Sequence, residues 1–316
     1  MKKTLFNSIL CAVILSASVC VTGCGSTVGS GTDSTQESSQ TPAFVNIEPD
    51  TTYTVEETEL PENVSVPETT IPTRDLCTLE ISDEVSCYHK TLNSVDYFNY
   101  ASGIIETNML NGDYYTIEYN VDMVNNESYQ HVKSSDFDEE IYSADGVTTT
   151  IDNTSEDSNN VRYDLAYCEA DDIAQNMEPY QYRSIESDAR RITTDENGIK
   201  CYHYRQNPTN LHYASTFSLF PQEMIFGFLS NQDLWEIKGT DEYLGREVTV
   251  ITGTTEPDYG SKLNIDNFIM YFDNKTGIML LFEGYDAAGN LTEYSKTTEF
   301  SDTQKAVPLF TYPVNN

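Results

Sequence analysis

A run of strand-like segments between Arg246 and Phe300 constrains the fold of this chain more than any other feature. Residues 247–252 (EVTVIT) alternate polar and apolar side chains, whereas residues 268–273 (FIMYFD) and 278–283 (IMLLFE) are denser apolar runs. Short turns that contain Gly and Asn separate them, and residues 291–296 follow as a further strand-like segment. Strands of about six residues joined by such turns predict an antiparallel meander.

Other segments carry strand and turn signals of the same kind. Residues 113–121 alternate, which places every second side chain on one face of a strand. The side chains on that face are Tyr115, Ile117, Tyr119 and Val121. Asp145-Gly146 lies between residues 139–143 and 147–151 and predicts a hairpin, because Asp-Gly is the strongest short turn signal. Further strands are expected over residues 129–133, after a turn at Asn125-Asn126, and over residues 199–204, after a turn at residues 195–198.

Helical signals are fewer and shorter. Residues 221–230 begin with a proline, which suits the first turn of a helix, and place Met224, Ile225, Phe228 and Leu229 on one side. We expect this helix to be buried against the concave side of the sheet, with Trp235 at the edge of the same core. We also expect residues 88–105 to be helical in part, with Gly103 as the stop. The weaker expectations are a strand or an ordered arm over residues 76–85, an exposed loop over 152–160, a helix over 169–177, and a strand or second short helix over 184–192.

The N-terminus has the parts of a bacterial lipoprotein signal. Lys2 and Lys3 form a positive region, and residues 5–19 form an apolar stretch too short for a membrane-spanning helix. Residues 21–24 (VTGC) resemble the lipobox of lipoprotein signal peptidase. We expect residues 1–23 to be removed and Cys24 to carry the lipid, which anchors the protein to the extracytoplasmic face of the cell membrane. An ordinary secretory signal with an incidental cysteine is the alternative.

The segment after the signal, residues 24–75, is expected to be a lipidated, disordered tether. It consists mainly of Ser, Thr, Glu, Gly and Pro, and its prolines recur without a hydrophobic period. Such a segment has too few apolar residues to form a core. The following residues, 76–316, have a suitable length for one domain.

The charge of the chain excludes one class of partner. The sequence has 17 basic and 51 acidic residues, a formal net charge of −34. Removal of residues 1–23 takes away two lysines and no acid, so the net charge becomes −36. This balance argues against nucleic acid, whose phosphates need a basic surface. It also opposes close contact with an anionic membrane surface, but it can attract cations or basic partners.

Four cysteines fall in the predicted domain. They are Cys77, Cys87, Cys168 and Cys201. Outside the cytoplasm, four cysteines allow two disulfides in three connectivities. Local pairing of Cys77 with Cys87 and of Cys168 with Cys201 is the expectation, and free buried thiols are the alternative.

Known catalytic and cofactor motifs do not occur in the sequence. There is no Gly-x-Ser-x-Gly elbow, His-Glu-x-x-His pair, paired Cys-x-x-Cys, phosphate loop or dinucleotide glycine pattern. Cys201 and His203 have the wrong spacing for a zinc pair. The acidic stretches 136–140 and 152–157 do not match an EF-hand loop, which favours a solvated acidic face. We therefore expect no enzyme activity, no cofactor and no metal.

Five segments in the last hundred residues form a pattern together. They are residues 217–223 (FSLFPQE), 235–239 (WEIKG), 244–253 (LGREVTVITG), 268–277 (ending in YFDNKTG) and Gly289-Asn290. A strand ending in Asp, a Thr-Gly turn, an apolar strand, a second turn and a final strand together resemble the lipoprotein-carrier (LolA-like) superfamily. Its members include the periplasmic carrier of lipoproteins and the sensor domains of sigma-factor regulatory proteins.

The resemblance implies a mainly β fold with a few short helices. Its curved antiparallel sheet would form an unclosed half-barrel, with the helices on the concave side around an apolar cavity that family members use for acyl chains or for sensing lipoproteins. The candidate cavity residues come from the apolar sides of the predicted helix and the two densest strands. They are Met224, Phe228, Phe268, Met270, Phe272, Leu280 and Phe282, and the alternative is that they only fill the core.

The sequence thus favours a non-enzymatic surface lipoprotein that binds an apolar ligand or lipid, or senses the state of the envelope together with a stress regulator. The second hypothesis is a protein-binding or scaffold module whose acidic face docks a basic partner. An unrecognised hydrolase is the third.

Replacement of Cys24 by serine tests the anchor. Because the lipid is attached through the thiol, the Cys24→Ser variant should incorporate no radiolabelled palmitate and should leave the membrane fraction. The control is Cys20→Ser in the same signal, which should keep both properties. Continued labelling of the Cys24→Ser variant would contradict the lipobox.

Overall fold

The structure is a computed structural model, and it describes residues 74–110, 112–155, 161–165, 192–205, 207 and 209–310. These residues fall within one compact unit, Pro72–Asn316. No helix among them is long and apolar enough to cross a membrane. Several predictions lie outside the described residues: the signal over residues 1–23, Cys24, the tether up to residue 73, Cys168, the helix over 169–177, and residues 156–160 and 184–191.

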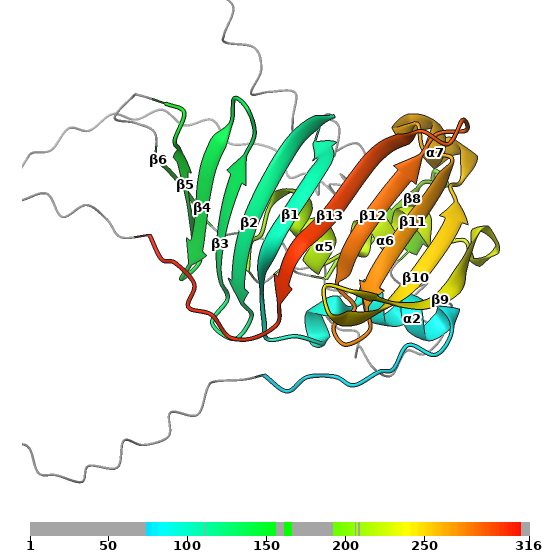
Figure 1. The fold of residues 1–316 in the computed structure, drawn as a ribbon, viewed down its shortest axis with the longest axis horizontal. Coiled ribbons are helices and arrows are strands. Elements are labelled where there is room, and N and C mark those ends of the chain that lie inside the picture. The colour runs from blue at the N-terminus through cyan, green and yellow to red at the C-terminus, as the bar shows by residue number, and fades with distance from the viewer. Residues whose placement is uncertain are drawn as a thin grey trace, which may run out of the picture. The chain divides into compact units, whose positions relative to one another are not determined.

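One antiparallel sheet of eleven strands dominates the described part (Figure 1). Its order is β6-β5-β4-β3-β2-β1-β13-β12-β11-β10-β9. The edges β6 and β9 do not pair with each other in the described part, so the sheet is an open half-barrel. The strands are β1 Tyr100–Leu110, β2 Asp113–Asp122, β3 Glu127–Lys133, β4 Asp138–Ala144, β5 Val147–Asp152, β6 Val161–Leu165, β9 Trp235–Tyr243, β10 Arg246–Thr254, β11 Asn267–Asp273, β12 Met279–Tyr285 and β13 Leu291–Ser301.

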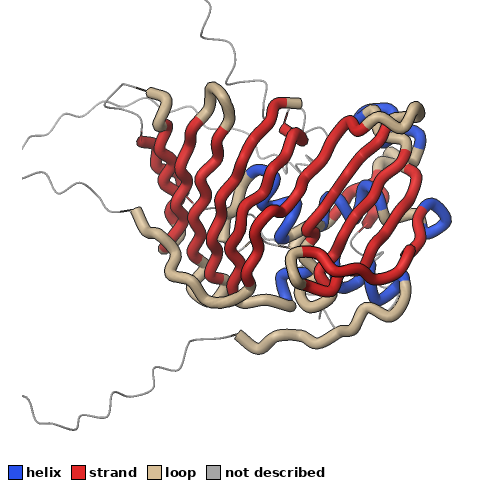
Figure 2. Tube along the Cα trace, in the orientation of Figure 1, coloured by secondary structure: helices blue, strands red, loops and turns tan. Residues whose placement is uncertain are grey.

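Short helices lie against one side of this sheet (Figure 2). Helix α5 packs on β1, β2 and β12, and α2 packs on α6. The mainly β half-barrel with helices on its concave side, which the resemblance implied, is therefore confirmed. The helices are α2 Glu84–Leu92, α5 Tyr213–Leu219, α6 Gln222–Phe228 and α7 Pro257–Leu263, with 3-10 turns η2 Ser94–Asp96 and η5 Gln232–Leu234, and β7 Ile192–Thr194 pairs with β8 Lys200–Tyr202.

Local sequence signals place most of the strands correctly. At the predicted Asp-Gly turn, Asp145 has φ 51° and Gly146 has φ 74°, the two left-handed positions that a two-residue hairpin needs between β4 and β5. Ile117, Tyr119 and Val121 of β2 are buried on one face, as the alternation predicts. The turn at residues 195–198 joins β7 to β8, although β8 is shorter than the expected strand.

Residues 88–105 are helical in part, as predicted, but the predicted stop at Gly103 is wrong. Helix α2 ends at Leu92, and β1 begins at Tyr100, so Gly103 lies inside a strand. A Cβ atom at position 103 would lie 2.1 Å from the backbone oxygen of Glu299 on β13. The glycine is thus required by the close approach of two strands and does not stop a helix. The helix signal is misleading here because Ile104-Ile105 fits both the 3.6-residue period of a helix and the two-residue period of a strand.

The N-terminal arm matches one of its two predicted forms. Residues 74–82 contain no strand, so they correspond to the ordered arm. Helix α2 starts earlier than predicted because Asp83 caps it. The Asp83 carboxylate accepts a hydrogen bond of 2.8 Å from the backbone N–H of Ser86.

The core has two apolar clusters on the concave side. The α5 cluster joins α5 to β1–β3 and includes Ile105, Ile117, Val132, Leu219 and Leu280. The α6 cluster joins α2 and α6 to β10–β12. Its buried members are Cys87, Tyr88, Leu92, Met224, Ile225, Phe226, Phe228, Leu229, Trp235, Ile251, Ile265, Phe268, Met270, Phe272, Met279 and Phe282. Trp235 belongs to the same core as α6, as predicted.

An ion-pair network connects the start of β10 to the end of β11 and to the residue that follows β13. Arg246 donates two hydrogen bonds, of 2.7 and 2.9 Å, to the carboxylate of Asp273 and a third of 3.2 Å to Asp302. Burial alone would lower the pKa of Arg246, but the bonds to Asp273 and Asp302 outweigh burial and raise it. Asp273 is 1% exposed and also accepts from the backbone N–H of Thr276 at 2.8 Å. The network therefore ties β10, the turn after β11 and the end of β13 together.

The Asp273→Ala variant should lower the free energy of unfolding by about 3 kcal/mol, because it leaves Arg246 partly buried without its main partner. The measurement is urea unfolding followed by circular dichroism. The control is Lys275→Ala, which removes an exposed ion pair to Asp302 and should cost less than about 1 kcal/mol. Equal losses in the two variants would contradict a central role for Asp273.

Candidate ligand-binding site

The structure brings six of the seven predicted cavity residues together. Each of the seven is at most 4% exposed. The six that share the α6 cluster are Met224, Phe228, Phe268, Met270, Phe272 and Phe282. The concave side of β10–β12 is therefore a continuous aromatic and methionine surface, and α6 lies on it.

Leu280 belongs to the α5 cluster and not to the α6 cluster. The cause is a bulge in β12. Tyr271 pairs with Leu281, but the next residue, Phe272, pairs with Met279, so Leu280 is the extra residue. Simple alternation along residues 278–283 could not predict this shift, because a bulge changes which side chains share a face.

Phe228 fastens α6 to the sheet. Its ring centroid lies 5.0 Å from that of Phe282, 5.1 Å from Phe268 and 5.2 Å from Tyr259 on α7. Contacts of this kind between aromatic rings add to the free energy gained by burial of apolar area. The neighbouring Gly227 makes room for Tyr259, since a Cβ atom there would lie 2.4 Å from the Tyr259 hydroxyl oxygen. The sequence did not indicate α7 as part of this site.

Two carboxylates at the margin of the α6 cluster have no cationic partner among the described residues. Glu223 lies on α6, and Glu293 lies on β13 opposite Gly284 of β12. Burial raises the pKa of both groups. Burial also raises the pKa of the Tyr259 hydroxyl, and the charges of both carboxylates raise it further. Within the described residues, neither carboxylate makes a hydrogen bond or an ion pair. The margin of the cluster is thus acidic and partly desolvated.

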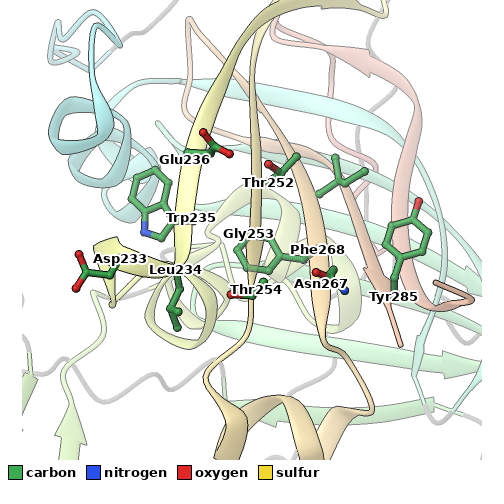
Figure 3. Close-up of a pocket in the computed structure, with 11 residues that line it drawn as sticks. Asp233, Leu234, Trp235, Glu236, Thr252, Gly253, Thr254, Asn267, Phe268 and Tyr285 are labelled. Atoms are coloured by element: carbon green, nitrogen blue, oxygen red, sulfur yellow. The ribbon is translucent and has the colours of Figure 1, made fainter. Parts of the chain in front are cut away.

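A pocket of about 530 Å³ opens at one end of β9–β12 (Figure 3). Phe268 lines it and is the only predicted cavity residue that does so. The others that line it are Asp233, Leu234, Trp235, Glu236, Thr252, Gly253, Thr254, Asn267, Ile269 and Tyr285. A second pocket, of about 480 Å³, lies along the arm before α2 and is lined by Thr78, Leu79, Glu80, Ser82, Asp83, Val85 and Ser86. Sequence patterns missed both, since polar and apolar side chains alternate in them without a recognised motif.

The predicted pairing of Cys77 with Cys87 is not formed. Both are free thiols, and Cys87 is fully buried in the α6 cluster. Helix α2 turns Cys87 inward, whereas the arm holds Cys77 beside Asp96 through a backbone hydrogen bond of 3.0 Å. The other predicted pairing involves Cys168, which lies outside the described residues. The described residues contain no group of three or more His, Cys, Asp or Glu placed to hold a metal ion.

The class of architecture is therefore an open antiparallel half-barrel with a packed apolar concave side. No protein-family model matches the chain. None of the curated proteins matches it either. Solved structures, in contrast, show similar folds.

Three of these structures are the following. The Mycobacterium tuberculosis lipoprotein LppX is 9% identical, with 72% of this chain and 98% of LppX covered and a TM-score of 0.36. The Pseudomonas aeruginosa MucA/MucB complex contains a chain that is 15% identical, with a TM-score of 0.35. The similarity covers 71% of this chain and 58% of the chain in the complex, which is less than two thirds of that chain's length. A putative outer membrane lipoprotein-sorting protein domain from Vibrio parahaemolyticus is 6% identical, with 69% of this chain and 91% of that domain covered and a TM-score of 0.24.

The buried acids predict a pH dependence of stability. A raised pKa means that the folded state holds the proton more tightly than the unfolded chain does. Proton binding therefore stabilises the folded state. This stabilisation is complete below the pKa of the glutamate in the unfolded chain, about 4.3, and it is lost as the pH rises through the pKa of the same group in the folded state. The Glu223→Gln and Glu293→Gln variants should therefore be more stable than the wild type at pH 7, by about 1 kcal/mol each.

The same variants should lose this advantage at pH 4. Urea unfolding at both pH values is the measurement, and Glu299→Gln on the exposed part of β13 is the control, with no gain expected. A constant difference across the pH range would argue against desolvation of the two carboxylates.

Proposed function

We propose that this protein is a non-enzymatic lipoprotein that binds an apolar ligand or lipid on the concave side of its half-barrel and through it senses the state of the envelope. The observation that carries the proposal is the α6 cluster. A helix of only seven residues covers an aromatic sheet surface, and its N-terminus has no side-chain cap. Such a short helix owes its stability mainly to packing. An acyl chain that made equivalent apolar contacts could take its place.

The composition of the cluster supports exchange of this kind. Met224 on α6 faces a sheet that supplies Met270 and Met279. Methionine side chains are flexible and polarisable, so they adapt to differently shaped apolar partners. Because the cluster residues are almost fully buried, ligand entry requires displacement of α6. A stress regulator as partner would then distinguish the closed state from the loaded state.

The location forms part of the same proposal. Residues 1–23 would direct export, Cys24 would carry the anchor, and residues 25–75 would hold the domain of residues 76–316 away from the membrane. A net charge of −36 after removal of residues 1–23 supports a protein that stays clear of anionic lipid headgroups. The ligand would contact Phe268, Met270, Phe272 and Phe282 of the sheet. Met224 and Phe228 of α6 would give way to it, and Leu280 belongs to the α5 cluster. We assign no catalytic residue and no cofactor.

Organic extraction and mass spectrometry test the proposal. The full chain carries Cys24→Ser, so that no anchor lipid contributes to the extract. We expect acyl lipid to co-purify with this protein, and to be lost when Met270→Glu is added, because a buried charge opposes an acyl chain. Circular dichroism checks that the second variant is folded.

Phe228→Leu provides a second test that does not depend on a buried charge. Loss of the ring contacts loosens α6 and should tighten binding of a fluorescent fatty acid by about tenfold, since less free energy is needed to open the site. The matched control is Phe98→Leu, whose ring stacks on Phe220 in the α5 cluster. No bound lipid and no fatty-acid binding by either protein would rule the proposal out.

A further inference from the structure

Strand β9 forms an edge of the large sheet that other described strands leave open. It pairs with β10 alone among them, and Figure 1 shows it as the outermost strand beside β10. Six of its nine residues are exposed. An edge strand presents backbone N–H and C=O groups that no neighbouring strand uses.

The hydrogen bonding of Glu242 shows which groups point outward. Its backbone N–H donates to the carboxylate of Asp241 at 2.8 Å. Backbone groups alternate in direction along an antiparallel strand, so those of Thr240 point outward as well. The outward side of this half of β9 can therefore form hydrogen bonds with an added strand.

The charges along this edge are mostly negative. Glu236, Asp241 and Glu242 are exposed, and the one basic residue of β9, Lys238, is ion-paired with Glu236. Glu242 also lies directly opposite Glu247 of β10. Like charges in this position destabilise a strand pair, and a bound cation would relieve that cost. A second copy of this acidic chain would instead add to the repulsion.

The 530 Å³ pocket adjoins the start of β9. Asp233 and Glu236 bring carboxylates to it, and no lysine or arginine is among the described residues that line it. Figure 3 shows the rings of Trp235, Phe268 and Tyr285 around the same space. Carboxylates together with aromatic rings suit the long stem and charged head of a lysine or arginine side chain.

We propose that the edge of β9 binds a basic, extended segment of a protein partner as an additional strand, with a lysine or arginine side chain in the pocket beside Trp235. Backbone hydrogen bonds would supply affinity, and the acidic side chains would select the partner. The register between β9 and β10 shifts at a bulge at Lys238. This bulge would prevent an ordinary flat strand from pairing with the whole edge. This surface shares Trp235 and Phe268 with the α6 cluster, but its test follows the backbone of β9 and needs no apolar ligand.

The probe is a short fluorescent peptide that alternates lysine and threonine, added to the full chain. Fluorescence anisotropy measures affinity, and hydrogen exchange measures protection of the β9 backbone. We expect the peptide to bind and to slow exchange of the outward backbone amides of β9, with that of Thr240 among them. General attraction between opposite charges would give binding without this protection.

Three variants separate the parts of the proposal. Thr240→Pro removes an outward N–H that makes no bond to β10, so it should abolish the protection at nearly normal stability. Asp233→Lys with Glu236→Lys should weaken binding at least tenfold, that is by about 1.4 kcal/mol. Glu118→Lys with Glu299→Lys changes the net charge equally, on β2 and β13, and should weaken binding less than about threefold.

Equal weakening by the two double variants would overturn the proposal, as would binding that leaves exchange of β9 unchanged. If Thr240→Pro fails to fold, the two double variants still decide between the β9 edge and a general acidic surface. Retention of full protection in a folded Thr240→Pro variant would also overturn it.

Discussion

The pairing of β1 with β13 is the interaction on which the rest of the structure depends. It joins the half-sheet β2–β6 to the half-sheet β9–β12, although the two strands are far apart in the sequence. The register shifts between Ile104 and Ile105, and Gly103 admits the backbone of Glu299 at a distance that excludes any side chain. Thr107 strengthens the join, since its hydroxyl donates to the backbone oxygen of Tyr294 at 2.9 Å. The α5 cluster contains side chains from both half-sheets, so its contact surface depends on this pairing.

The helices depend on the sheet more than on their own sequences. Helices α5 and α6 have seven residues each and no side-chain cap at their N-termini. They are held by packing and by a few polar anchors, such as the Ser218 hydroxyl, which donates to the backbone oxygen of Met279 at 2.5 Å. Short helices whose stability depends on packing suit the proposed exchange of side chains for a ligand on the concave side.

The two proposed surfaces use opposite properties of the same sheet. The concave side offers apolar, adaptable side chains, whereas the β9 edge offers backbone groups and negative charge. Trp235 and Phe268 belong both to the α6 cluster and to the lining of the pocket beside that edge. The indole N–H of Trp235 also donates to the backbone oxygen of Leu229 at the end of α6, at 3.0 Å. The proposed ligand site on the concave side and the pocket at the β9 edge therefore share side chains.

Local sequence patterns were sufficient to predict the features that depend on neighbours along the chain. Alternation located β2, Asp145-Gly146 located a hairpin, and the apolar side of residues 221–230 located α6 with Met224 and Phe228. Its acidic composition argued against nucleic acid as a partner. Each of these signals spans a few residues, so local propensity and turn chemistry were sufficient to read them.

Other features depend on contacts with residues far away in the sequence, so they became known from the fold. Gly103 lies in a strand because β13 approaches it, and the bulge in β12 moves Leu280 to the other cluster. Cys77 and Cys87 stay apart because α2 turns one inward while Asp96 holds the other. Strand β9, which the strand signals did not indicate, becomes an edge through its pairing with β10. Strand register and exposure at an edge are set by contacts between distant segments, which a local pattern does not encode.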